Sequence, residues 1–202
     1  MNDHDLIKAV KKGDEKAFHE LVENYQQMII GTALGFVGNL DDAHDITQDV
    51  FIEIYRSINS FRADSSLSTW IYRITITRSL NHIRREKRHK DQIVVETDIR
   101  EETSDPLEDA DRKKILHLAI SSLPKNQQIA FTLHNYEDLS YKQIAQIMQR
   151  SISSVESLIF RARKNLQKKL WEWYKNSRVW AQVFPNAIVK PSEQQNMNCI
   201  KT

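Results

Sequence analysis

The chain has 202 residues, of which 28% are charged and only four are glycine, so it has room for one ordinary domain or two small ones. Cys199 is its only cysteine, which excludes an intrachain disulfide and a multi-cysteine zinc site and fits a reducing compartment. The N-terminus has no signal-peptide pattern, and no apolar run approaches the ~18 residues of a membrane span. We therefore predict a cytoplasmic protein that is neither secreted nor inserted into a membrane.

The net charge of +2 conceals three blocks of opposite sign along the chain. Residues 73–90 are strongly basic, residues 91–111 are strongly acidic, and residues 150–178 are basic again. Because an acidic run without apolar periodicity stays solvated, we expect a flexible acidic linker at residues 89–110. No glycine follows Gly38, which excludes phosphate loops and glycine hairpins from most of the chain and favours helices.

The first half contains three predicted helices. Asp14 is a suitable N-cap for a helix whose apolar residues recur at steps of three and four. The pair Gly38-Asn39 ends this helix. A second helix begins near residues 41–42, and its inward positions are Ala43, Ile46, Val50, Ile54 and Ile58. A third stretch runs from about 67 to 87, apolar at its start and basic at its end. Together these elements predict a helical domain at residues 1–88.

A second helical domain is predicted at residues 111–174. Two stretches within it match the capping-box pattern of a helix start, at Ser140 with Gln143 and at Ser153 with Glu156. The separation between these two predicted helix starts leaves room for one short helix and a turn, which is the spacing of a helix-turn-helix. We therefore predict an all-α fold of two small helical domains joined by the flexible acidic linker, the second with a helix-turn-helix.

Four stretches, taken in this order, resemble the extracytoplasmic-function sigma factors, which confer promoter specificity on bacterial RNA polymerase. They are DITQDVFIEIYR from Asp45, FRADS from Phe61 with TWIYRI from Thr69, LSYKQIAQIM from Leu139, and VESLIFRAR from Val155. The resemblance covers roughly residues 3–174 and leaves residues 175–202 as a tail that is either disordered or docked on the second domain.

This resemblance implies three binding surfaces. The second predicted helix would dock on the coiled coil of the polymerase's largest subunit through Asp45, Gln48, Asp49, Ile52 and Arg56. The next loop and helix would capture a flipped base and hold the strand-separated minus-ten promoter element through Phe61, Arg62, Asp64, Ser65, Thr69, Trp70, Arg73, Thr77, Arg84 and Arg85. The helix-turn-helix would bind the minus-thirty-five element through Ser154, Ser157, Phe160, Arg161 and Lys164.

The resemblance also implies the partners. They are the RNA polymerase core, promoter DNA and a dedicated inhibitor, the anti-sigma factor, that hides the docking surface until a signal arrives. The acidic linker would thread the polymerase's RNA channel. No cofactor and no small-molecule substrate are implied.

Several of these residues also have a simpler interpretation. Trp70 and Tyr72 could be packed aromatics of the first domain, and the burial of Trp70 decides between packing and DNA contact. Glu156 is better explained as a capping-box acid than as a base reader, and Ser153 as the cap itself. Arg163, Lys168 and Lys169 are more simply solvated charges or phosphate contacts.

Two other function classes stay open on the residues alone. An autonomous helix-turn-helix regulator would bind duplex DNA unaided, as a dimer on paired half-sites, and a helical adaptor would use its basic faces for acidic proteins. An enzyme is not predicted, since Asp45 and Asp49, one turn apart, lack further ligands and no catalytic motif accompanies them. The seven histidines form no metal-spaced pair.

Overall fold

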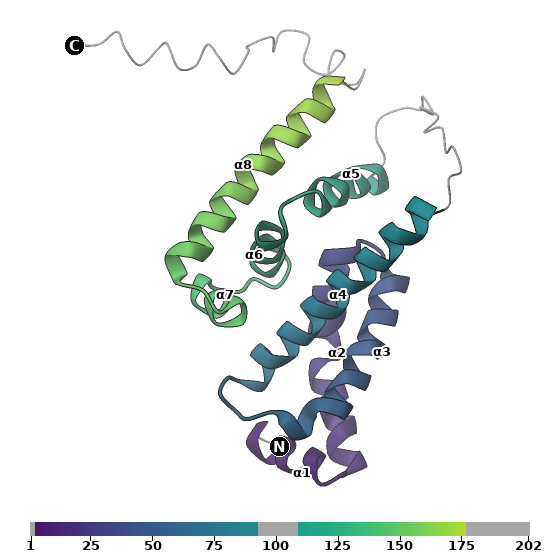
Figure 1. Cartoon of the computed structure of the whole chain (residues 1–202), viewed down its shortest axis with the longest axis vertical. Helices are drawn as coiled ribbons and strands as arrows, with labels where there is room; N and C mark the ends of the chain where they lie inside the picture. The colour runs from purple at the N-terminus through teal and green to yellow at the C-terminus, as the bar shows by residue number, and fades with distance from the viewer. Residues whose placement is uncertain (1–2, 93–108, 177–202) are drawn as a thin grey trace, which may run out of the picture. The chain divides into compact units, whose positions relative to one another are not determined.

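The computed structural model describes residues 3–92 and 109–176 (Figure 1). Its elements are α1 (Asp3–Lys11), α2 (Glu15–Val37), α3 (Leu40–Ser57), the short 3-10 helix η1 (Ile58–Ser60), α4 (Leu67–Gln92), α5 (Asp109–Ser121), α6 (Lys125–Asn135), α7 (Tyr141–Met148) and α8 (Ile152–Asn176). This order confirms the predicted all-α class. Most of the predicted linker, at 93–108, and most of the tail, at 177–202, lie outside the described residues.

Helix α2 begins and ends where the sequence predicts. The Asp14 carboxylate accepts hydrogen bonds from the backbone amides of Lys16 at 2.9 Å and Ala17 at 3.2 Å, which satisfies two of the amides that a helix start leaves unpaired. At the other end, Gly38 has a left-handed φ of 78°, and its amide donates to the Leu34 carbonyl. Glycine suits this C-cap because it lacks a Cβ.

Helices α1 to α4, with η1, form the N-terminal bundle, in which α2, α3 and α4 run side by side (Figure 1). The Asn39 side chain caps α3 by accepting from the Asp42 amide at 2.8 Å. The five positions predicted to face inward on this stretch are at most 2% exposed, so that prediction is confirmed. They pack with Leu21, Ile29 and Ile71 in one apolar core, and each fully buried Ile, Leu or Val side chain stabilises the fold by about 1.5–3 kcal/mol.

Helix α1 was not predicted from the sequence. It has nine residues, and its buried residues are Leu6 and Val10, which lie one turn apart and face α2 and η1. The nine residues hold four apolar side chains within five positions, which is too short a pattern to separate a helix from a loop. Tertiary packing therefore specifies α1, because so short a helix is marginal in isolation.

The second half forms the helix-turn-helix segment, defined as α5, α6, α7 and α8 as far as Leu166. Ser140 starts α7 with a complete capping box, because its hydroxyl accepts from the Gln143 amide while the Gln143 side chain accepts from the Ser140 amide. The predicted capping box at Ser153 is wrong. α8 starts two residues earlier, where the Ser151 hydroxyl accepts from the Ser154 amide at 3.2 Å.

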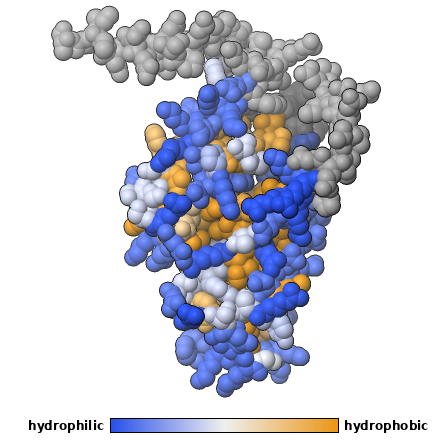
Figure 2. All heavy atoms as spheres, viewed as in Figure 1, coloured by the Kyte–Doolittle hydropathy of each residue, from blue (hydrophilic) through white to orange (hydrophobic). Residues whose placement is uncertain are grey.

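The described residues as far as Leu166 form one compact unit, and those from Gln167 onward belong to a second. Within the first unit, a second apolar cluster joins Phe36, Tyr72 and Ile76 of the N-terminal bundle to residues of α6, α7 and α8. Figure 2 shows mainly hydrophilic residues on the visible face, with smaller apolar patches among them. Among the described helices, none is long and apolar enough to span a membrane.

Candidate nucleic-acid interface

The loop between η1 and α4 forms one wall of a surface pocket, here called the loop pocket. It has a volume of 180 Å³ and is lined by Ser60, Phe61, Arg62, Asp64, Ser65, Trp70 and Arg73. The Phe61 side chain is buried, and its ring centroid lies 5.1 Å from that of Trp70. The Lys11 Nζ donates a hydrogen bond to the Phe61 carbonyl at 2.7 Å. Six of the ten residues predicted for the minus-ten element therefore line one pocket, which α1 helps to position.

Tyr72 and Trp70, for which core packing and DNA contact are the two interpretations, differ in burial. Tyr72 is 7% exposed and belongs to the second apolar cluster, so its packing interpretation is confirmed. Trp70 is half-buried: it packs against the core of the N-terminal bundle and also lines the loop pocket. Its burial therefore allows both of its interpretations at once.

The remaining minus-ten candidates lie outside the loop pocket. Thr69 is buried, and its hydroxyl accepts a hydrogen bond from Ser66 Oγ at 2.9 Å, which places it in the first turn of α4. Thr77 is exposed and donates its hydroxyl to the Arg73 carbonyl at 2.8 Å. Arg84 and Arg85 are exposed near the end of α4.

Arg73 is engaged with the other half of the chain. Its Nε donates to the carbonyl of Ile147 at 3.1 Å, and its Nη2 donates to the carbonyl of Gln146 at 2.8 Å. Both carbonyls lie at the C-terminal end of α7, where a helix leaves its carbonyls unpaired and carries partial negative charge. This pairing joins α4 to α7.

Four of the five residues predicted to bind polymerase line a second hollow, the α3 hollow. It has a volume of 440 Å³ and is lined by Asp45, Gln48, Asp49, Ile52, His82, Arg85 and Glu86. Ile52 is 48% exposed, and the fifth predicted residue, Arg56, is exposed outside this hollow. Arg85, predicted to contact DNA, lies 3.8 Å from the Asp49 carboxylate. The structure thus brings Arg85, predicted for the minus-ten surface, close to Asp49, predicted for the polymerase-binding surface.

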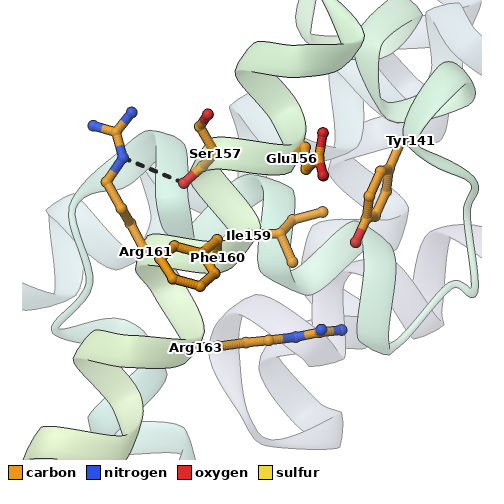
Figure 3. Close-up of a pocket in the computed structure, with 7 residues that line it drawn as sticks. All are labelled: Tyr141, Glu156, Ser157, Ile159, Phe160, Arg161 and Arg163. Atoms are coloured by element: carbon orange, nitrogen blue, oxygen red, sulfur yellow. Dashed lines mark hydrogen bonds between the residues drawn. The ribbon is translucent and has the colours of Figure 1, made fainter. Parts of the chain in front are cut away.

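The helix-turn-helix carries a third hollow, the α8 hollow, on its outer face (Figure 3). It has a volume of 490 Å³ and is lined by Tyr141, Glu156, Ser157, Ile159, Phe160, Arg161 and Arg163. Phe160 is 67% exposed, and Arg161 Nε donates to the Ser157 carbonyl at 3.2 Å. Lys164 is exposed outside the hollow, and Ser154 is half-buried in the first turn of α8.

Four residues of the α8 hollow were not among those predicted for the minus-thirty-five element, and they are Tyr141, Glu156, Ile159 and Arg163. Tyr141 comes from the first turn of α7, and Arg163 is exposed on α8. Figure 3 shows Tyr141 facing α8 across the hollow. The resemblance covers both positions but marks neither as a reader, and only the packing of α7 on α8 reveals that they share a surface. Among the described side chains, no group of three metal-ligating residues is close enough to hold a metal ion.

An all-helical chain with a basic helix-turn-helix and a second basic helix defines a DNA-binding protein. Residues 21–89 match the family model for Sigma-70 region 2, and residues 113–166 match that for Sigma-70, region 4. The chain belongs to the sigma-70 family, among its ECF sigma factors. It is 37% identical over 180 residues to RNA polymerase sigma-H factor of Pseudomonas aeruginosa, covering 83% of this chain and 93% of that protein.

Two further comparisons agree with this family. The chain is 34% identical over 182 residues to ECF RNA polymerase sigma-E factor of Haemophilus influenzae, covering 84% of this chain and 96% of that protein. Its structure is similar to the sigma factor RpoE in complex with the anti-sigma factor NepR from Bartonella quintana, at 26% identity and a TM-score of 0.55. That similarity covers 77% of this chain and 97% of the RpoE chain.

Proposed function

We propose that this ECF sigma factor directs the RNA polymerase core to promoters through the loop pocket, the α3 hollow and the α8 hollow. The observation that carries the proposal is that the residues predicted for each surface from the sequence lie together in space, six, four and three of them lining one hollow each. Residues 1–88 would form the minus-ten and polymerase-binding domain, and residues 111–174 the minus-thirty-five domain. The protein would act in the cytoplasm as a non-catalytic initiation factor without a cofactor.

The loop pocket has the chemistry to hold a single unpaired base. The half-buried Trp70 supplies an apolar aromatic wall on which a base can stack, and the buried Phe61 ring packs against it. Stacking on an aromatic ring contributes about 1–3 kcal/mol per base. Asp64 and Ser65 supply hydrogen-bonding groups for the base edge, while Arg62 supplies a cation for the adjacent phosphate. Capture of a flipped base would hold the strands of the minus-ten element apart.

The α8 hollow would meet the minus-thirty-five element as a duplex. Arg161 and Ser157 lie on the exposed face of α8, and Phe160 offers an apolar contact for a thymine methyl group. Exposed Arg84 and Arg85 near the end of α4 would contact phosphates and add affinity without reading sequence.

The α3 hollow would receive the polymerase. Charged side chains around the exposed Ile52 make a small apolar contact with a polar rim, as protein interfaces have. An anti-sigma factor would hide this surface, a proposal supported by the similar RpoE chain, whose structure is a complex with the anti-sigma factor NepR.

The experiment is run-off transcription by purified bacterial core polymerase on a pool of randomised promoters, with and without this protein. The expected result is a set of protein-dependent transcripts that share a two-part upstream motif. Arg161→Ala should relax the upstream part of the motif, since loss of a bidentate guanine contact costs about 1–3 kcal/mol of discrimination. Asp49→Ala should lower all transcripts together, since it weakens polymerase docking.

Matched controls separate these effects from general loss of charge. Lys125→Ala removes an exposed cation outside the α8 hollow, and Asp41→Ala removes an exposed acid of α3 outside the α3 hollow. Both should leave the motif and the yield unchanged. If no transcript depends on the protein while it shifts duplex DNA unaided, it acts as an autonomous regulator and the proposal is wrong.

A further inference from the structure

The carboxylate of Glu156 on α8 has no role in starting that helix. The capping box at Ser153, which would have used it, is wrong, because α8 starts at Ile152. The Ser151 hydroxyl caps the helix by accepting from the Ser154 amide. Glu156 is the fifth residue of α8, which places it beyond the first turn, where a carboxylate gains most from the helix dipole. Its presence on α8 therefore needs an explanation other than capping.

The Glu156 side chain lies in the α8 hollow. It is exposed, and it lines the hollow together with Ser157, Phe160 and Arg161. Figure 3 shows its carboxylate between α8 and Tyr141 and draws no hydrogen bond from it. Within the described part of the chain, no ion pair or side-chain hydrogen bond engages this carboxylate. It is also the one acid among the described residues that line the hollow, and it is available to an incoming ligand.

The chemistry of a carboxylate restricts what this ligand can be. An ionised carboxylate only accepts hydrogen bonds, and the negative charge of DNA phosphates repels it. In the major groove the donors are the amino groups of cytosine, N4, and of adenine, N6. At adenine the amino group lies beside the N7 acceptor, which repels the second carboxylate oxygen, whereas at cytosine it lies beside C5–H. A carboxylate in the groove therefore selects cytosine.

The neighbours of Glu156 suit the same base. Phe160 follows one helical turn later, so its ring lies on the same face of α8, and it is 67% exposed. An exposed aromatic ring gives the apolar C5 edge of a pyrimidine a contact that needs no polar partner. Arg161 lies five residues after Glu156, about 7.5 Å along a helix, which corresponds to about two base-pair steps of ~3.4 Å. The carboxylate and the guanidinium can therefore read different base pairs.

We propose that Glu156 is a specificity-determining residue of the minus-thirty-five surface and accepts a hydrogen bond from the N4 amino group of a cytosine. Repulsion by phosphates lowers the affinity for every sequence, and the cytosine contact recovers the loss at one base pair only. Glu156 thus rejects sequences without the amino group as well as favouring the one that has it. The inference rests on the minus-thirty-five role of α8 proposed above and adds a base that this surface selects.

The test is run-off transcription by the full-length protein with core polymerase, on promoters randomised in the upstream part of the motif. The unsubstituted protein should favour cytosine at one position by about fivefold or more. Glu156→Gln keeps the side-chain length and supplies an amide that pairs with adenine N6 and N7, so the preference there should move to adenine. Glu156→Ala should remove the preference. Glu172→Gln changes another exposed glutamate of α8, outside the hollow, and should leave the motif unchanged.

A second arm of the test identifies the atom. Pyrimidin-2-one is cytosine without its 4-amino group, and we place it at the favoured position of the promoter. The analogue should lower transcription by the unsubstituted protein about fivefold more than it lowers transcription by Glu156→Ala. This coupling is expected where the side chain and the amino group are in contact. The weaker base pairing of the analogue affects both proteins alike and cancels in the comparison.

Three results would overturn the inference. The first is a motif that neither Glu156→Gln nor Glu156→Ala changes. The second is a uniform rise in transcription from all promoters with Glu156→Gln, which is the effect of a solvated charge alone. The third is an equal loss by both proteins on the pyrimidin-2-one promoter. Failure of the proposed function is distinct, because then no transcript depends on the unsubstituted protein, or Arg161→Ala leaves the upstream part of the motif intact.

Discussion

The hydroxyl of Tyr72 donates a hydrogen bond to the Glu137 carboxylate at 3.2 Å, which joins α4 to the turn after α6. Burial raises the pKa of Glu137 above its ordinary value of 4.5; Asp138 raises it further, and hydrogen bonds from Tyr72 and Thr32 offset part of the rise. Burial, followed by the charge of Glu137, also raises the pKa of Tyr72. Both groups therefore hold their protons more tightly here than in the unfolded chain.

This pair predicts a stability that falls as pH rises. Because the folded state binds the Glu137 proton more tightly than the unfolded state, the stabilising effect is fully present below the ordinary pKa and is lost as pH rises through the raised pKa. The measurement is the free energy of unfolding by urea from about pH 4 to about pH 8. Glu137→Gln keeps a hydrogen-bond acceptor for Tyr72 and removes the ionisation, so its profile should lose this component.

The control for the pH series is Asp138→Asn, because Asp138 is an exposed carboxylate directly beside Glu137. It should keep most of the pH dependence. Profiles of the unsubstituted protein and Glu137→Gln that run parallel over the whole range would show that Glu137 does not carry the effect.

The start of α8 predicts a contrast between two serines. Ser151→Ala removes the hydroxyl that accepts the Ser154 amide and should lower the free energy of unfolding by about 1 kcal/mol. Ser153→Ala changes an exposed serine whose hydroxyl lies 3.2 Å from that of Ser151, so the backbone cap stays in place and the effect should stay within about 0.5 kcal/mol. Urea unfolding of both variants measures this difference. A larger loss of stability for Ser153→Ala than for Ser151→Ala would show that Ser153 is the cap after all.

The tie between α1 and the loop pocket predicts a role for Lys11. Lys11→Met removes the hydrogen bond to the Phe61 carbonyl and should cost about 1–2 kcal/mol of stability, together with a fall in transcription from promoters that depend on the minus-ten element. Lys12→Met, at the exposed neighbouring position, should change neither quantity. Equal transcription by both variants would separate Lys11 from promoter recognition.

The core of the helix-turn-helix predicts a large effect at one isoleucine and a small one at another. Ile144 of α7 is fully buried, so Ile144→Ala should lower the free energy of unfolding by about 2–5 kcal/mol. Ile152 at the start of α8 is 51% exposed, and Ile152→Ala should change it by no more than about 0.5 kcal/mol. Thermal unfolding distinguishes the two variants, and similar melting temperatures would contradict the burial.

Periodicity and capping chemistry predicted most of the fold. The inward positions of α3, the Asp14 cap, the Gly38 C-cap and the Ser140 capping box are local patterns, and a local pattern is visible in a sequence. The cap of α8 was misplaced because the capping-box pattern favours Ser153, which has Glu156 three residues later, whereas Ser151 has Ser154 there and caps the helix through its hydroxyl alone. α1 was missed because its helix depends on packing with α2 rather than on its own sequence.

The residues of the candidate site were predicted from the family resemblance, whereas several of the contacts between them are visible only in the folded structure. The residues of the loop pocket lie within one short stretch, so their proximity follows from the sequence order. Contacts across long separations had no such signal: Lys11 with Phe61, Arg85 with Asp49, and Arg73 with the end of α7. Each joins a charged side chain to another element, at a backbone carbonyl for Lys11 and Arg73 and at a carboxylate for Arg85. An amphipathic pattern does not say which of these groups will meet.

The bond from Lys11 to the Phe61 carbonyl has a practical consequence for exchanging promoter specificity between relatives. The Sigma-70 region 2 match begins at residue 21, whereas Lys11 lies at the end of α1. A chimera cut at the match boundary would transplant the loop without the lysine that anchors its backbone. The smallest transferable unit for this half of the promoter is therefore α1 to α4 together.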